Sequence, residues 1–350
     1  MLRRPLLPCK AWSSHFRCLK NSRLAPRLVS EVARERPFEF VKEEGRGLSA
    51  RAKRDLSLGD VVLIEQPVLA VENNGKGDEW KEDLHSRYEA LSEERQSQVW
   101  NLHDACLQKP EKSLEGILFT NCIGRNLPVR FDAALFLELS RFNHSCSPNL
   151  EQTWNADTGE VRLVAAEPVK AGEELCTHYV ELRLDRAERR QRLHENYGFW
   201  CECPACAQPS EESDKRRTEI KRLAESIEKD RQDRLKNMER GERSVKRVLK
   251  LLDKEGLHLL SWRKTHCLAG MEFALRQGDL AKSIQWARKG HQYARLAHGP
   301  DHRDTKMLLQ LMEDPSSHPD FQFRTDEMKD WTAYVVVMSI AFVVFTVLYI

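Results

Sequence analysis

The residues most suited to chemistry form a C-x-C-x-x-C cluster. The cluster consists of Cys201, Cys203 and Cys206. Three thiolates so close together can share one zinc ion, which prefers tetrahedral sulfur ligation. The fourth ligand must come from elsewhere: Cys146 is the first choice, and Cys176 and Cys122 are alternatives. Ten cysteines in 350 residues are too few for a disulfide scaffold. A structural zinc site in a reducing compartment is therefore favoured over redox chemistry or unpaired buried cysteines.

Two further stretches carry polar residues that could form a site with this cluster. Residues 143–149 read Asn-His-Ser-Cys-Ser-Pro-Asn, and residues 172–179 read Gly-Glu-Glu-Leu-Cys-Thr-His-Tyr. Asn, Ser and Pro make the first stretch a structured loop. Taken alone, Tyr179 is a core strand tyrosine and His144 a structural histidine. Only the three stretches together indicate a functional site.

Short strands and helices must position these residues. Apolar residues alternate with polar ones over 38–71, which predicts short strands, and helical spacing from Trp80 to Leu107 predicts a helical insert. Further segments are predicted as helices or turns at Leu114–Cys122 and Phe131–Leu139, strands at Leu150–Trp154 and Val161–Val164, a turn then a strand at Val169–Tyr179, and a charged helix at Arg183–Asn196.

From residue 211 onward the pattern is helical. The expected helices are Ile220–Lys254, His258–Gln277, Leu280–Ala297 and Asp304–Met312, with small residues suited to close packing between them. Their pairing is similar to tetratricopeptide repeats, although the period is irregular. The basic runs Arg189-Arg190 and Lys215-Arg216-Arg217 are predicted to lie on solvated helix faces.

Both ends of the chain differ from this ordinary composition. Residues 1–36 form a basic N-terminal segment. Seven lysines and arginines are spread over residues 1–30, and the first acidic residue is Glu31. This composition is typical of a disordered basic arm or of a mitochondrial transit peptide within 1–30. Residues 331–350 contain no charged side chain, and a helix of this length spans the hydrocarbon core of a bilayer, which is roughly 30 Å thick. We expect a C-terminal transmembrane helix that acts as a tail anchor in the endoplasmic reticulum or a mitochondrial membrane, with the body in the cytosol. The formal net charge of +2 gives no reason to expect nucleic-acid binding.

Residues 38–206 resemble SET-domain protein-lysine methyltransferases of the SMYD type. The resemblance rests on the 143–149 loop, the 172–179 stretch and Tyr-Gly-Phe-Trp-Cys-Glu-Cys-Pro-Ala-Cys at 197–206. This sequence departs from the SMYD pattern in having no MYND finger within 48–130. The fold class implied is α+β, with small sheets, knot-like threading and a helical insert at about 73–130. The regions are a SET domain at 37–196, a post-SET zinc motif at 197–210, a helical region at 211–325 and the anchor at 331–350.

The resemblance also implies S-adenosylmethionine as cofactor and lysine as acceptor. Tyr179 matches the catalytic tyrosine, and Tyr197 is a candidate for the wall of the lysine channel. The matching cofactor-binding residues are Gly45, Arg46, Gly47, Asn121, Asn143, His144 and Phe199. His178 stands where the family often has an acidic or small residue, so it receives no role.

The function expected is therefore S-adenosylmethionine-dependent methylation of lysine in a histone or another protein, at a membrane. The alternative is a membrane-anchored helical-repeat scaffold with a weak or inactive SET fold. The expected partners are a protein substrate that bears a lysine, a lipid bilayer at 331–350 and proteins bound by the helical region.

Overall fold

The computed structural model describes residues 36–44, 46–73, 78–106, 111–124, 131–233, 238–319 and 321. The predictions for the basic N-terminal segment, for Gly45 and for the anchor at 331–350 lie outside the described residues. The chain divides into two compact units, Met1–Ser210 and Glu211–Ile350.

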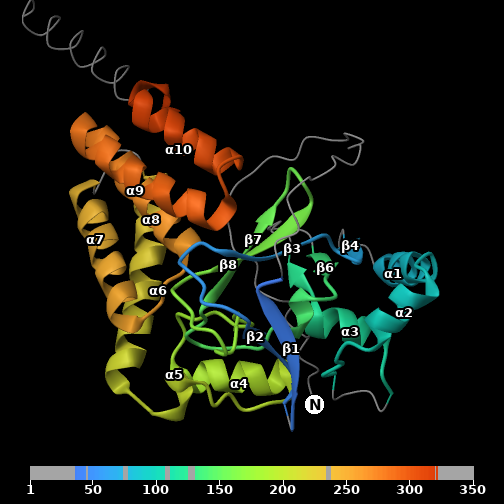
Figure 1. The fold of residues 1–350 in the computed structure, drawn as a ribbon. Coiled ribbons are helices and arrows are strands. Elements are labelled where there is room, and N and C mark those ends of the chain that lie inside the picture. Colours follow the sequence, from blue (N-terminus) through green and yellow to red (C-terminus); the bar gives the residue numbers. More distant parts are fainter. Residues whose placement is uncertain are drawn as a thin grey trace, which may run out of the picture. The chain divides into compact units, whose positions relative to one another are not determined.

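The first unit contains small antiparallel sheets (Figure 1). Strands β1 (Phe38–Glu43) and β2 (Gly47–Ala52) form one sheet. A second has the order β3-β8-β7, and a third has the order β4-β6-β5. These strands are β3 (Val61–Glu65), β4 (Leu69–Asn73), β5 (Ile123–Gly124), β6 (Phe131–Leu135), β7 (Leu150–Asn155) and β8 (Glu160–Ala165). The short-strand prediction for 38–71 and the 150–164 hairpin are confirmed.

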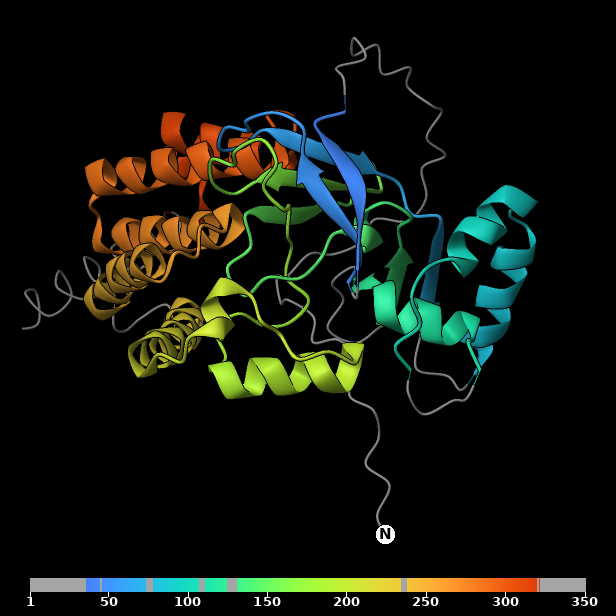
Figure 2. The ribbon, with the colours of Figure 1, turned by 60° about the horizontal axis from the view of Figure 1, so that its bottom comes forward.

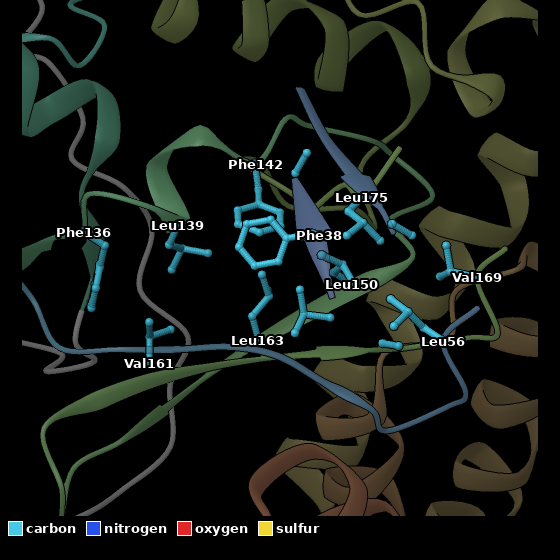
Figure 3. Packing of buried hydrophobic residues seen from close by; sticks show 14 of the residues in the cluster. Phe38, Leu56, Phe136, Leu139, Phe142, Leu150, Val161, Leu163, Val169 and Leu175 are labelled. Atoms are coloured by element: carbon cyan, nitrogen blue, oxygen red, sulfur yellow. The ribbon is translucent and has the colours of Figure 1, made fainter. Parts of the chain in front are cut away.

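A continuous apolar core joins the β1–β2 and β3-β8-β7 sheets. The rings of Phe38 and Phe142 meet edge to face with centroids 5.0 Å apart, and both residues are fully buried (Figure 3). Leu150 and Leu163 from the hairpin and Leu175 from the later loop complete this packing. Because Phe142 immediately precedes the 143–149 loop, the core fixes the start of that loop.

The predicted helical insert consists of α1 (Glu79–Glu89), α2 (Glu93–Trp100) and α3 (Leu114–Asn121). It has its own apolar cluster, in which Leu84, Val99 and Ile117 are fully buried against β4 and β6. Side chains of Ser92 and Ser113 accept hydrogen bonds from backbone N–H groups in the first turns of α2 and α3, respectively, as good N-caps do.

Two predictions near the site are wrong. Phe131–Leu139 is not helical: it forms β6 and then a 3₁₀ turn, η1 (Leu139–Arg141). Ala133, Ala134 and Leu135 are all fully buried, so this strand between β4 and β5 shows no polar alternation. Val169–Tyr179 is extended but makes only isolated bridges, because it pairs in turn with three different segments, at Leu56, at β2 and at the 143–149 loop.

The second unit is helical, as predicted (Figure 1). Its helices are α6 (Glu211–Gln232), α7 (Met238–Glu255), α8 (Leu260–Gln277), α9 (Leu280–His298) and α10 (Arg303–Glu313), followed by the 3₁₀ turn η2 (Pro315–Ser317). Each helix packs chiefly on its neighbour in sequence. Among the helices in the described ranges, none is both long and apolar enough to span a bilayer.

The single long helix expected at Ile220–Lys254 is instead the antiparallel pair α6 and α7. Ion pairs fix this arrangement: Arg240 with Asp230 near the connection, Arg247 with Glu219 farther along, and Arg217 with Glu255 at the open end. Folding back lets the apolar stripes of both helices bury together, which one straight helix could not achieve.

The basic runs are not wholly solvated, contrary to the sequence-based prediction. Arg189 and Arg217 are both fully buried. The Nε atom of Arg217 lies 2.6 Å from Glu255 Oε1, so this buried charge is paired within the second unit. Arg189 has a different environment, on α4 (Arg186–Tyr197), beside the cysteine cluster.

Candidate functional site: an aromatic and cysteine-rich centre

The 143–149 loop and the 172–179 stretch lie against each other, as predicted. The backbone N–H of Thr177 donates to Asn143 O at 2.9 Å, and Ser145 N–H donates to Thr177 O at 2.8 Å. The Asn149 carboxamide closes the same pairing, since it donates to Glu174 O and accepts from Cys176 N–H. These hydrogen bonds hold two segments that are distant in sequence side by side at the site.

Tyr179 is held at both its backbone and its hydroxyl. Its hydroxyl donates to Phe142 O at 2.7 Å, and its backbone N–H donates to Nδ1 of His144 at 2.9 Å. The ring of Tyr197 lies 4.9 Å away, centroid to centroid. Burial raises the pKa of Tyr179 well above its ordinary value. The hydroxyl therefore remains protonated and precisely oriented at neutral pH.

These contacts determine the protonation state of the His144 ring. Because Nδ1 accepts the Tyr179 N–H, it carries no hydrogen, and the neutral ring must carry its hydrogen on Nε2. Nε2 lies 3.2 Å from Cys146 Sγ. His144 thus connects the aromatic residues to the cysteine cluster.

A polar group forms on the other side of the loop, around Glu174. The Asn143 carboxamide donates to Glu174 Oε1 at 2.9 Å and to Leu48 O at 3.2 Å. The Arg46 guanidinium reaches both oxygens of Glu174, at 3.0 and 3.1 Å, and also pairs with Glu43. Burial lowers the pKa of Arg46, but the charges of Glu174 and Glu43 and the hydrogen bond to Glu174 together outweigh burial and raise that pKa. Two predicted cofactor-binding residues therefore share one carboxylate.

Helix α4, whose ribbon appears in Figure 2, ends just before two aromatic residues with different surroundings. Gly198 caps this helix in the left-handed region with φ +78°, a conformation that glycine adopts at little cost. After this turn the Phe199 ring faces His144, with centroids 6.4 Å apart. Trp200 instead stacks on His194 at 4.3 Å and stays half exposed. Phe199, 36% exposed, is therefore the aromatic surface that is open beside the 143–149 loop.

The four predicted zinc ligands come together. The Sγ atoms of Cys146, Cys201, Cys203 and Cys206 all lie within 4.8 Å of one another. Tetrahedral zinc with Zn–S bonds of about 2.3 Å places its sulfurs about 3.8 Å apart, so this cluster fits zinc closely. The short helix α5 (Pro204–Ala207) turns the chain so that Cys206 can reach Cys146. Of the three candidates for the fourth ligand, Cys146 is the one in the cluster.

The hydrogen bonds among the four cysteines act unequally: the pKa is raised for Cys146 and Cys201 and lowered for Cys203 and Cys206. A hydrogen bond with Cys146, followed by one with Cys201, lowers the pKa of Cys206 to about 6. Hydrogen bonds with the other three thiols also lower the pKa of Cys203. In contrast, burial raises the pKa of Cys176 to about 12, so that sulfur remains a thiol. The ligand set is therefore defined by the distances, which bring Cys146 and not Cys176 into the cluster.

The other predicted site residues lie elsewhere or remain undescribed. Gly47 begins β2 with φ +80°, a left-handed conformation that completes the turn between β1 and β2 beside Arg46. Asn121 ends α3, where its carboxamide donates to His103 O and Ile117 O within the helical insert. Gly45 lies outside the described residues.

Sequence reasoning missed two residues that the structure places at the site. Glu174 was visible only as part of the Gly-Glu-Glu run, with no sign of its partners. Arg189 was assigned to a solvated face. Its spacing from Arg186 and Leu193 on one helical stripe was the available signal, because a buried leucine marks the inward face.

One family model and several known proteins are similar to this chain. The family model described as "SET domain" matches residues 45–180. The histone-lysine N-methyltransferase set5 of Schizosaccharomyces pombe is 25% identical over 84% of this chain and 92% of its own length. Human N-lysine methyltransferase SMYD2 is 37% identical over 27% of this chain, a match that spans 21% of SMYD2. Rubisco LSMT bound to AdoMet, a solved structure, is 15% identical with a TM-score of 0.32, over 84% of this chain and 89% of that one.

The chain resembles SET-domain proteins over residues 45–180. Within that class it is similar to the SET5 and SMYD2 lysine methyltransferases, which confirms the SMYD-like resemblance found in the sequence.

Proposed function

We propose that this protein is an S-adenosylmethionine-dependent protein-lysine methyltransferase. The observation that carries the proposal is the clamped, protonated Tyr179 hydroxyl beside the His144 loop. The names of set5 and SMYD2 and the SET match support the same activity.

The residues around the loop suit this cofactor. Arg46 is a half-exposed cation that can meet a carboxylate, and Asn143 is a carboxamide beside it. Phe199 presents an exposed ring of the kind on which an adenine can stack. When bound, S-adenosylmethionine supplies the sulfonium methyl group for transfer to a lysine amine.

Tyr179 would then orient the acceptor amine. Its hydroxyl proton is committed to Phe142 O, so the oxygen lone pairs can accept a hydrogen bond from an amine N–H. Its raised pKa makes it unsuitable as a base, and the lysine must reach the site already deprotonated. The contribution of the site is therefore alignment of the amine and exclusion of water, with Tyr197 as one wall.

Zinc would be held by Cys146, Cys201, Cys203 and Cys206, and its role would be structural. Four sulfur ligands leave no coordination position for substrate. The metal would tie the 201–206 segment to the 143–149 loop, which sets the position of Phe199 relative to His144.

Membrane tethering belongs to the same proposal. The charge-free run 331–350 supports a C-terminal anchor, and the basic residues in 1–30 support a mitochondrial membrane as one destination. The substrate would then be a protein at or near that membrane, a histone or another one. Tags at each end of the chain, imaged with organelle markers, test this: a freely diffusing body would contradict the anchor.

The enzyme proposal is tested with the purified full-length chain, methyl-labelled S-adenosylmethionine and cell lysate depleted of small molecules. We expect labelled protein bands that carry methyl-lysine and disappear with Tyr179→Phe. Tyr88→Phe is the matched control, since it also removes a hydroxyl that donates to a backbone carbonyl, but in the helical insert. Measurable cofactor binding with no labelled protein would instead favour the scaffold alternative.

A further inference from the structure

Helix α4 presents a row of arginines to the cysteine segment. Arg186, Arg189 and Arg190 are spaced i, i+3 and i+4, so they share one face. Arg186 Nε donates to Cys206 O at 2.7 Å, and Arg190 Nε donates to Cys201 O at 3.1 Å. These two arginines therefore bind the backbone at the first and the last cysteine of the 201–206 segment.

Arg189 differs from its neighbours because it reaches a sulfur atom. Its Nη2 lies 3.9 Å from Cys206 Sγ, and its Nη1 donates to Leu184 O. The side chain has no solvent exposure. Among the ion pairs of the described residues, none joins Arg189 to a carboxylate. A buried guanidinium without a carboxylate requires some other negative charge, because burying an unpaired charge costs several kcal/mol, as an order of magnitude.

The cysteine cluster can supply that charge. A divalent ion bound by four thiolates carries a net charge of −2, and a buried dianion is itself unfavourable without nearby positive charge or N–H donors. Besides Arg189, His144 Nε2 lies 3.2 Å from Cys146 Sγ, and the Cys146 backbone N–H donates to Cys203 Sγ at 3.3 Å.

We infer that Arg189 is the buried counter-charge of the four-cysteine zinc centre. The inference rests on the proposed zinc site. Arg189 is a positioning residue, because it acts on the metal through Cys206. Since Arg189 lies on α4, metal binding also favours the packing of α4 against the cysteine segment. The ligand class is a thiophilic divalent ion, Zn²⁺ or its probe Co²⁺.

The test compares two variants that both replace the guanidinium and differ in charge. In the full-length protein, Arg189→Gln should lower zinc affinity at least about ten-fold, while Arg189→Lys should stay within about three-fold of the wild type. Arg192→Gln on the same helix is the control, because Arg192 pairs with Glu188 and makes no described contact with the cluster. Zinc affinity is measured by competition with a chromogenic chelator. The thiolate-to-Co²⁺ absorption band gives the number of sulfur ligands.

A failure of the proposed zinc site and a failure of the counter-charge role of Arg189 give different results. If the wild type binds no zinc, the metal site itself is wrong. If the wild type binds zinc and Arg189→Gln and Arg189→Lys lose affinity equally, the charge is irrelevant and the inference is overturned. Should Arg189→Gln fail to fold, Arg189→Lys decides alone: affinity within about three-fold supports the counter-charge, and a ten-fold loss despite the retained charge overturns it.

Discussion

The backbone N–H of Tyr179 donates to Nδ1 of His144, while the other ring nitrogen of His144 faces Cys146 Sγ. One imidazole therefore touches both the proposed catalytic residue and a proposed zinc ligand. Its two nitrogens can be tested separately, since the oxygen of an asparagine side chain lies near the position of Nδ1, and the end of a glutamine side chain near that of Nε2.

We expect opposite effects from the two substitutions. His144→Asn keeps an acceptor for Tyr179 N–H and loses the contact with Cys146, so zinc affinity should fall by about ten-fold with kcat largely kept. His144→Gln keeps the donor near Cys146 and loses the Tyr179 contact, so kcat should fall by about ten-fold, which corresponds to one hydrogen bond of about 1.4 kcal/mol. Zinc competition and methyl-transfer kinetics on both proteins provide the check. Identical profiles for the two would contradict this division of roles.

Glu174 offers a second test, at the proposed cofactor site. Its carboxylate orients Arg46 and Asn143 together, so Glu174→Ala should raise KM for S-adenosylmethionine by about ten-fold, as expected for a lost charge-assisted hydrogen bond. Glu174→Gln keeps an acceptor for Asn143 and should show a smaller increase. The neighbouring Glu173→Gln is the control, because the described hydrogen bond of the Glu173 side chain comes from Lys170 N–H and not from Arg46 or Asn143. An unchanged KM in Glu174→Ala would remove Glu174 from the site.

His178 should make stability depend on pH. Burial, opposed by nearby Glu181, lowers the pKa of His178 to about 4, below the ordinary value of about 6.5. Between these values the unfolded chain binds more protons than the folded chain, so the free energy of unfolding should decrease as pH falls from 6.5 to 4. The loss is about 2 kcal/mol, allowing for the partial exposure of the side chain.

Denaturant unfolding at several pH values checks this. His178→Gln should flatten the slope. A slope that persists in His178→Gln would assign the effect to other groups.

Part of this site could be predicted from sequence because chemistry and spacing are local there. Cys201, Cys203 and Cys206 are close in the chain, so their shared role can be predicted without knowledge of the fold. The fourth ligand is different: Cys146 and Cys176 both lie in polar stretches, and only the pairing of Thr177 with Asn143 and Ser145 determines which sulfur faces the cluster.

The errors also have physical causes. Residues 133–135 are buried on both faces of the sheet, which removes the period of two that identifies a strand. Arg189 lies in a highly charged helix, and its burial depends on the cysteine segment folding onto that face. Such contacts between distant segments are absent from local composition.

The helical unit provides a final prediction, on packing alone. Gly270 of α8 lies against Trp286 of α9, and a Cβ there would be 2.7 Å from the indole ring. Alanine favours helix over glycine by about 1 kcal/mol, but this overlap must displace a nearly buried tryptophan. Gly270→Ala should therefore destabilise the protein by about 1–3 kcal/mol.

Gly290 of α9 is the matched control. A Cβ there would lie 3.4 Å from Cys267 and Leu308, which is ordinary contact. Gly290→Ala should thus be neutral or stabilising by up to about 1 kcal/mol, so the two substitutions, identical in chemistry, should differ in sign. Thermal unfolding of both variants measures this. Equal stability of Gly270→Ala and the wild type would mean that Trp286 has room to move, and that helices α8 and α9 are not tightly packed at this point.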